Sequence, residues 1–216
     1  MVLSYVRLDS PTCSSSWHRR GNVSPVLQLA QQPPADALLD ADPLALLVGM
    51  LLDQQIPMEK AFAGPYVLAE RMGVKRLDAF AIADHDPEAF AKMFAGPPAI
   101  HRFPGAMAGR VQELARRLVS DYEGRADVVW STAKSGADLH ARLAALPGFG
   151  AQKARIFVAL LGKQRGVRPT GWRAAAGPYG EKDSYRSVAD VTSPESLQKV
   201  RAHKKEMKAA ARSQIS

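Results

Sequence analysis

The stretch Pro147-Gly148-Phe149-Gly150 has the residue types that bind a phosphate group. Proline ends a helix, and the two glycines permit backbone angles closed to other residues and leave no side chain between the backbone and a ligand. The amides of Gly148, Gly150 and the turn that starts at Ala151 can then point outward together. Such a nest at a helix N-terminus binds phosphate, helped by the helix dipole. The alternative is an ordinary tight turn between antiparallel helices.

The segments on both sides of this stretch are predicted to be helical. Apolar residues recur at helical spacing before and after it, and they define one buried face on each helix: Leu139, Leu143 and Leu146, then Ala154, Phe157, Val158 and Leu161. The two glycines therefore lie in a short connection between two amphipathic helices.

Leu146-Pro147-Gly148-Phe149-Gly150, with Ala154 after it, resembles the helix-hairpin-helix motif of the HhH-GPD DNA glycosylase superfamily, which acts in base-excision repair. A second segment upstream, Leu51-Leu52-Asp53-Gln54-Gln55, looks like the glutamine-containing helix end of that superfamily. In the superfamily a further helix follows this segment, and in this sequence one is expected from Pro57. The resemblance covers roughly residues 34–165.

The resemblance implies particular roles for residues of both segments. In the family a glutamine enters the gap left by a flipped nucleotide, which implies this role for Gln55 and, next to it, Gln54. An amide suits that role because it meets the unpaired base edges as both donor and acceptor. The hairpin side implies DNA contacts, which would involve Gly148, Phe149, Gly150, Gln152 and Lys153. The alternative for Gln55 is a solvent-exposed residue that ends a helix.

The sequence departs from the family at the catalytic aspartate. The stretch where the resemblance implies that residue runs from Val167 to Arg173 and contains no acid. Asp53 is the first candidate for a substitute acid, followed by Asp183 and Asp190. The alternative for Asp53 is a helix-end residue that bonds to a nearby backbone amide. The alternative for the other two is a role in turns.

A second departure concerns the lysine nucleophile of the lyase branch, whose place is occupied by Gln152. Lys153 follows one position later, about 100° further around the helix, so the sequence predicts that lyase activity is absent. Cys13 is the only cysteine, which excludes a cysteine-bound iron–sulfur cluster. The histidines show no metal-binding spacing. We therefore expect no cofactor beyond a monovalent cation that hairpin carbonyls of this superfamily can hold.

The charge balance favours a polyanionic partner. Lys and Arg number 29 against 21 Asp and Glu, which gives a net charge of +8 and a pI near 9.8. The first 20 residues lack an apolar stretch of signal-peptide length, and the longest apolar run, Leu44–Leu52, is too short to span a bilayer. We expect a cytoplasmic monomer that binds double-stranded DNA and does not associate with membranes.

The pattern of the whole chain predicts an all-α fold of two helical lobes, with the hairpin facing a DNA-binding groove. Residues 1–33 are expected to be a flexible extension, 34–165 the helical domain, and 166–216 an irregular segment followed by a basic helix from Pro194. Further helices are expected at 44–55, 57–72, 77–83, 87–94 and 106–124. The basic C-terminal helix either grips phosphate or is a solvated tail. Trp172, Tyr179 and Tyr185 either stack on bases or pack in the core.

The sequence is compatible with three functions. The first is a DNA glycosylase or close relative that flips damaged or mismatched bases, with catalysis not assured. The second is a non-catalytic protein that binds distorted or abasic DNA, which the missing aspartate favours. The third is a fold recruited for contact with protein or RNA.

Overall fold

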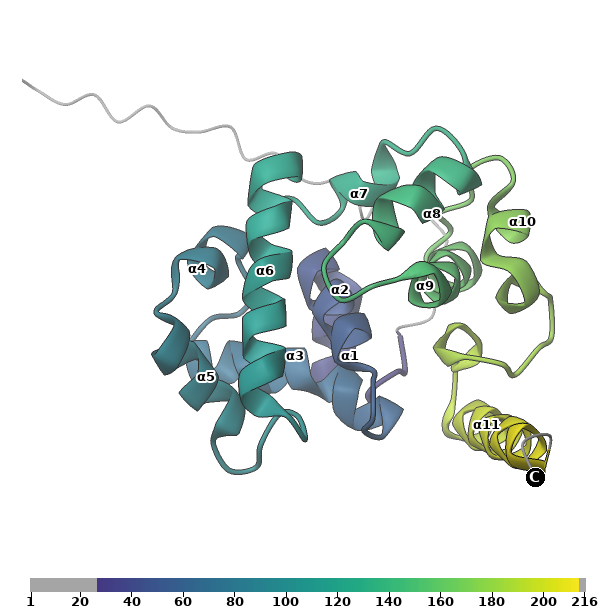
Figure 1. Cartoon of the computed structure of the whole chain (residues 1–216), viewed down its shortest axis with the longest axis horizontal. Coiled ribbons are helices and arrows are strands. Elements are labelled where there is room, and N and C mark those ends of the chain that lie inside the picture. The colour runs from purple at the N-terminus through teal and green to yellow at the C-terminus, as the bar shows by residue number, and fades with distance from the viewer. Residues whose placement is uncertain (1–26, 214–216) are drawn as a thin grey trace, which may run out of the picture.

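The computed structural model describes residues 27–213, and within that range the chain is helical and contains no strand. The predicted all-α class is confirmed (Figure 1). The elements are α1 (Pro33–Ala41), α2 (Pro43–Leu52), α3 (Met58–Met72), α4 (Ala79–Asp84), α5 (Pro87–Ala95), α6 (Pro104–Tyr122), α7 (Val128–Ser131), α8 (Gly136–Ala144), α9 (Ala151–Gln164), α10 (Trp172–Ala176), the 3₁₀ turns η2 (Gly177–Gly180) and η3 (Val188–Asp190), and α11 (Pro194–Ser213).

Helix α2 lies at the centre of the fold because its sequence is apolar on every side. Residues Leu44 to Leu52 are all buried. Asp42 caps the helix, as the Asp-Pro pair predicted: its carboxylate accepts hydrogen bonds from the amides of Leu44 at 2.9 Å and Ala45 at 3.2 Å. The other oxygen of the same carboxylate accepts from the Leu77 amide at 2.8 Å, which ties the segment before α4 to the start of α2.

Two groups of helices flank α2 (Figure 1). In one group α4 and α5 pack on α6, and in the other α8, α9 and α10 pack on one another. Helix α2 contacts α3 and α6, and the buried apolar residues of the described chain form one continuous core. The two predicted lobes are therefore two helix groups built on a shared core. No helix in the described range is long and apolar enough to cross a membrane.

The expected boundary at residue 34 is wrong, because the segment from Leu27 belongs to the core. Leu27, Leu29 and Ala30 are buried. The carboxylate of Asp36 in α1 accepts hydrogen bonds from the amides of Ala30 at 2.8 Å and Gln32 at 3.1 Å, which fixes this segment against α1. The remainder of the predicted extension, residues 1–26, lies outside the described residues, as does Cys13.

The segment expected to be irregular contains short helical turns that pack on α9. Helix α10 and the turns η2 and η3 contact it. The side chain of Gln164 at the end of α9 donates to the carbonyl groups of Ala189 at 2.9 Å and Val191 at 3.1 Å. Helix α11 starts at Pro194 as predicted. The C-terminal part of the chain is therefore held by the hairpin's second helix.

Candidate nucleic-acid interface

The hairpin between α8 and α9 has the geometry that its two glycines predict. Gly148 has φ +78° and Gly150 has φ +75° with ψ 168°, conformations that side chains disfavour. The Phe149 amide donates to the Leu146 carbonyl at 3.1 Å, which closes the turn. No side chain caps α9, and its first turn carries no acidic residue. The first amides of α9 are thus directed toward the region before the helix, where they can donate hydrogen bonds to an anion.

The hairpin lies directly against the end of α2. A Cβ atom added to Gly148 would lie 3.3 Å from two side-chain carbons of Leu51, so the backbone packs closely on that residue. From the first turn of α9, Lys153 Nζ donates to the Leu51 carbonyl at 2.8 Å. These contacts bring together two segments that are about 100 residues apart in the sequence, and they place the loop from Asp53 to Pro57 beside the hairpin.

The two glutamines of this loop differ in their surroundings. The Gln54 side chain donates to the Leu51 carbonyl at 2.8 Å and accepts from Arg110 of α6 at 3.0 Å. Gln55 is exposed and has φ +57°, a left-handed conformation that is uncommon outside glycine. Gln54 is therefore held in place by the protein, whereas Gln55 is presented to solvent.

The side chain of His101 hydrogen-bonds to the backbone of this loop, a role that the sequence did not predict. It is 1% exposed. Its Nδ1 accepts from the Phe103 amide at 3.0 Å, so the neutral ring carries its proton on Nε2, which lies 2.9 Å from the Gln54 carbonyl oxygen and donates to it. Burial lowers the pKa of His101, which favours this neutral form. A lone buried histidine has no pattern in the sequence that would indicate this role.

Asp53 and Lys153 lie near enough at the end of α2 for each charge to shift the pKa of the other group, although no ion pair joins them. Burial raises the pKa of Asp53, while the positive charges of Lys204 and Lys153 act in the opposite direction. Burial also lowers the pKa of Lys153 to about 8, against the favourable charge of Asp53. An amine with a pKa of about 8 is partly neutral near that pH, and a neutral amine can act as a nucleophile.

Lys153, and not Gln152, is the α9 residue that reaches the end of α2. Its long side chain extends to the Leu51 carbonyl, and Asp53 is near enough for its charge to affect the pKa of Lys153. The prediction that lyase activity is absent stays a prediction. Gln152 lies on the other side, where its amide donates to the Tyr179 hydroxyl at 3.0 Å. The side-chain register of α9 relative to α2 could not be read from the sequence of either helix alone.

The predicted DNA contact by Phe149 needs correction. Its side chain is 3% exposed and packs edge-on against Phe157 of α9, with ring centroids 5.9 Å apart. The ring of Phe149 therefore lies in the core and not on the hairpin surface. The phenylalanine between the two glycines anchors the turn in the core because an aromatic ring buries a large apolar area there.

The segment 167–173, which contains no acid, makes contacts within the fold. The Thr170 carbonyl accepts from the Gly136 amide at 2.8 Å, and Arg168 donates to the Gly162 carbonyl at 2.8 Å. Trp172 is buried, which favours core packing over base stacking for this aromatic. Tyr185 is 37% exposed and lies 4.6 Å from the Lys199 ammonium.

The two other candidate acids do not lie with Asp53 at the end of α2. Asp190 lies 2.5 Å from Lys163 Nζ and forms a capping box with Ser187. Asp183 is exposed in a turn with φ +54°. Both have the turn-forming roles that were their alternatives, and Asp53 is left as the candidate acid next to the hairpin.

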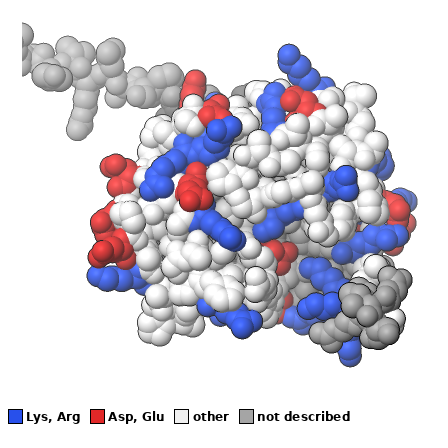
Figure 2. All heavy atoms as spheres, in the orientation of Figure 1, with Lys and Arg blue, Asp and Glu red and all other residues white. Residues whose placement is uncertain are grey.

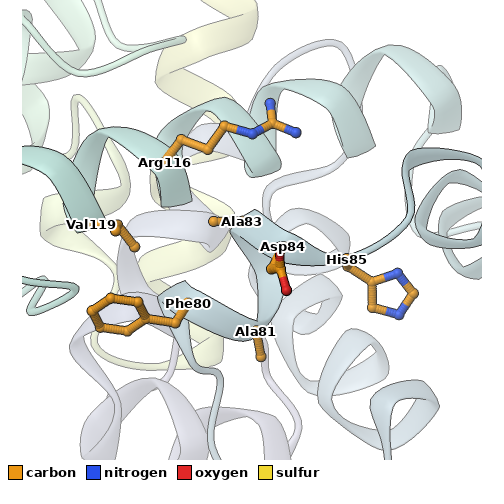
Figure 3. Close-up of a pocket in the computed structure, with 7 residues that line it drawn as sticks. All are labelled: Phe80, Ala81, Ala83, Asp84, His85, Arg116 and Val119. Atoms are coloured by element: carbon orange, nitrogen blue, oxygen red, sulfur yellow. The ribbon is translucent and has the colours of Figure 1, made fainter.

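The described residues hold no cluster of three or more His, Cys, Asp or Glu side chains that could bind a metal ion. A surface hollow lies away from the hairpin, between α4 and α6, and Figure 3 shows Phe80 and Val119 at one end and His85 at the other. Asp84 and Arg116 lie at its rim, and its lining includes neither Asp53 nor Lys153. We do not assign it to the site.

Comparisons with protein-family models, with curated proteins and with solved structures gave no match. The assignment of function therefore rests on the geometry of the site.

Proposed function

We propose that this protein binds double-stranded DNA and recognises distorted or damaged nucleotides by inserting Gln55 into the base stack. The amides of Gly148, Gly150, Ala151 and Gln152 hold a backbone phosphate next to that point. One observation supports the proposal: Gly148 and Lys153 contact Leu51, four residues before the exposed Gln55, so the N-terminal end of α9 lies against the end of α2.

The chemistry of both parts fits a single ligand. A helix N-terminus without an acidic residue or a capping side chain favours an anionic phosphate. An exposed amide in a left-handed conformation, supported by a firmly bonded neighbour, can enter a gap and pair with base edges. Duplex DNA offers a phosphate and an unpaired base a short distance apart wherever a nucleotide is extruded.

The test measures the affinity of the purified protein for two matched duplexes, one intact and one with an abasic site. We expect tighter binding to the abasic duplex and a steep loss of affinity as salt rises. Gln55→Ala should remove the preference for the abasic duplex while leaving binding to intact DNA. Gln28→Ala, at another exposed glutamine, is the control. Absent or salt-independent binding of the wild-type protein would exclude the proposal.

A second candidate function, excision of the recognised base, is favoured by the proximity of Asp53 to Lys153. In the proposed step the neutral Lys153 amine attacks the sugar C1′ atom, the bond from C1′ to the base breaks, and Asp53 takes the proton that the amine loses. The base leaves with a proton from solvent. The nitrogen lone pair then forms the C1′=N bond while the C1′–O4′ bond breaks, and O4′ takes the proton back from Asp53. The product is a protonated imine between Lys153 and the opened sugar, which borohydride can reduce.

This second function is tested on duplexes that carry uracil, alkylated, oxidised or mismatched bases. Alkali treatment reveals released bases as strand breaks, and borohydride traps the imine as a covalent complex. Asp53→Asn should abolish release, and Lys153→Met should abolish trapping. No release from any of these duplexes, together with tight binding to abasic DNA, would identify a non-catalytic binder.

A further inference from the structure

The first turns of α11 are firmly attached to the rest of the protein. Leu197 and Val200 are buried, and Ser196 accepts hydrogen bonds from the amides of Thr192 and Ser193, each at 2.8 Å. Arg201 forms an ion pair with Glu59, which lies in the first turn of α3. The start of α11 therefore has a defined position next to the loop that presents Gln55.

The ion pair also shows which face of α11 is directed toward that loop. Arg201, Lys204, Lys205 and Lys208 are spaced by three, four and seven positions, so they lie on one face of the helix. Because Arg201 reaches Glu59, this basic face is turned toward the start of α3. The charge of Lys204 is also near enough to Asp53 to lower the pKa of that carboxyl group, which places the face beside the candidate site.

Beyond Arg201, which pairs with Glu59, the lysines of this face form no ion pair with described acidic residues. Residues from Ala202 to Ala210 are exposed, except for half-buried His203. No ion pair between described residues involves Lys204, Lys205 or Lys208, and these three lysines line a shallow hollow together with Ala209. Figure 2 shows Lys and Arg side chains gathered around the end of α11, at the lower right of the view.

We propose that the basic face of α11, formed by Lys204, Lys205 and Lys208, is a second DNA-backbone contact that acts together with the hairpin. In Figure 1 α11 is seen nearly end-on with its C-terminus toward the viewer, and the hairpin crosses in front of α2. The C-terminal part of α11 and the hairpin thus both lie on the side of the molecule that faces the viewer in Figure 1. A duplex that meets the hairpin presents further phosphates at regular intervals, which a row of exposed lysines can neutralise. This inference rests on the proposed function.

The test compares three proteins on an intact DNA duplex of about 25 base pairs, over a series of salt concentrations. The variant replaces Lys204, Lys205 and Lys208 by Gln. The control replaces Lys75, Arg76 and Lys92, exposed residues at the far end of α3 and on α5, by Gln, so both variants lose the same charge. Since each neutralised phosphate contributes about 0.9 to the slope of log affinity against log salt, the α11 variant should lose roughly 2 to 3 in slope. The control should keep the wild-type slope.

The outcomes separate this inference from the proposed function. If wild-type protein binds the duplex and the α11 variant keeps its full slope, α11 makes no phosphate contact and the inference is wrong, whereas the proposed function stands. If the wild-type protein does not bind the duplex, both are wrong. Equal loss of slope in the control variant would show a non-specific charge effect and also overturn the inference. The same salt series can be measured on a double-stranded RNA. Tighter binding of RNA than of DNA, through the same three lysines, would overturn the inference that α11 contacts DNA. Because the three lysines are exposed, the melting temperature should not change.

Discussion

At the scale of single residues, the site depends on groups whose ionisation is set by burial. Asp53 and Lys153 are both partly removed from water, and each lowers the energetic cost of the other's charge. His101 remains neutral and holds the Gln54 carbonyl. The Lys153 amine therefore loses its proton at mildly alkaline pH. An ordinary surface lysine keeps its proton at this pH.

Lys153 should make the stability of the protein rise at alkaline pH. Its pKa is about 8 in the folded protein and 10.5 in an unfolded chain, so between these values the unfolded chain binds more protons. The free energy of unfolding therefore increases with pH across this window through this group. With a discount for partial exposure, we expect an increase of about 1 to 2 kcal/mol.

Urea unfolding of wild-type protein and Lys153→Met, at pH values from 7.5 to about 10.5, measures this contribution. The difference between the two curves isolates the lysine, since every other titrating group is shared. The prediction fails if the two proteins show the same pH dependence.

At the scale of elements, the connection between α8 and α9 holds the functional geometry. Gly150 combines φ +75° with ψ 168°, a region almost restricted to glycine, and no atom lies within 4 Å of the place where its Cβ would be. Glycine is needed at this position because of its backbone angles, and not because a side chain would lack space. The same residue precedes the amides that we propose to hold phosphate.

Gly150→Ala should destabilise the protein by roughly 1 to 3 kcal/mol and weaken DNA binding, because the strained backbone would move the first amides of α9. Gly73→Ala is the matched control. Gly73 also has positive φ and open space around it, but its φ of 68° and ψ of 29° lie in the left-handed helical region. The control should lose about 1 kcal/mol and keep its affinity for DNA. If Gly150→Ala and Gly73→Ala changed the affinity for DNA equally, the hairpin would not be part of the DNA-binding site.

At the scale of the whole molecule, one core joins segments from both ends of the described chain. Leu29 is fully buried although it precedes the first helix, and α11 returns to the start of α3 through Arg201. The basic residues differ in their surroundings. Lys163 and Arg201 form ion pairs within the fold, whereas Lys204, Lys205 and Lys208 on the basic face of α11 form none with acidic side chains in the described range.

Leu29→Ala should lower the free energy of unfolding by about 2 to 5 kcal/mol, as expected for a buried leucine that leaves a cavity. Gln28→Ala, at the exposed neighbour, should change it by less than about 0.5 kcal/mol. Denaturant unfolding of both variants measures the difference. A small effect of Leu29→Ala would mean that the segment before α1 contributes little to the fold.

The sequence alone determined those features that depend on neighbouring residues. Helical periodicity and the cap at Asp42 predicted most helices to within a few residues, for example α6 at Pro104–Tyr122 where 106–124 was expected. Prolines and glycines predicted the hairpin, and Pro194 predicted the start of α11. These signals are local because caps and turns form between residues close in the chain.

Only the tertiary structure decided which side chains meet. It placed Lys153 beside Asp53, buried Phe149, supported Gln54 with His101 and Arg110, and brought Arg201 to Glu59. Each of these contacts depends on how one helix is rotated and displaced against another. The physical reason is that helix packing follows the shapes of whole apolar faces, so the partner of a polar side chain at the edge of such a face is not encoded near it in the sequence.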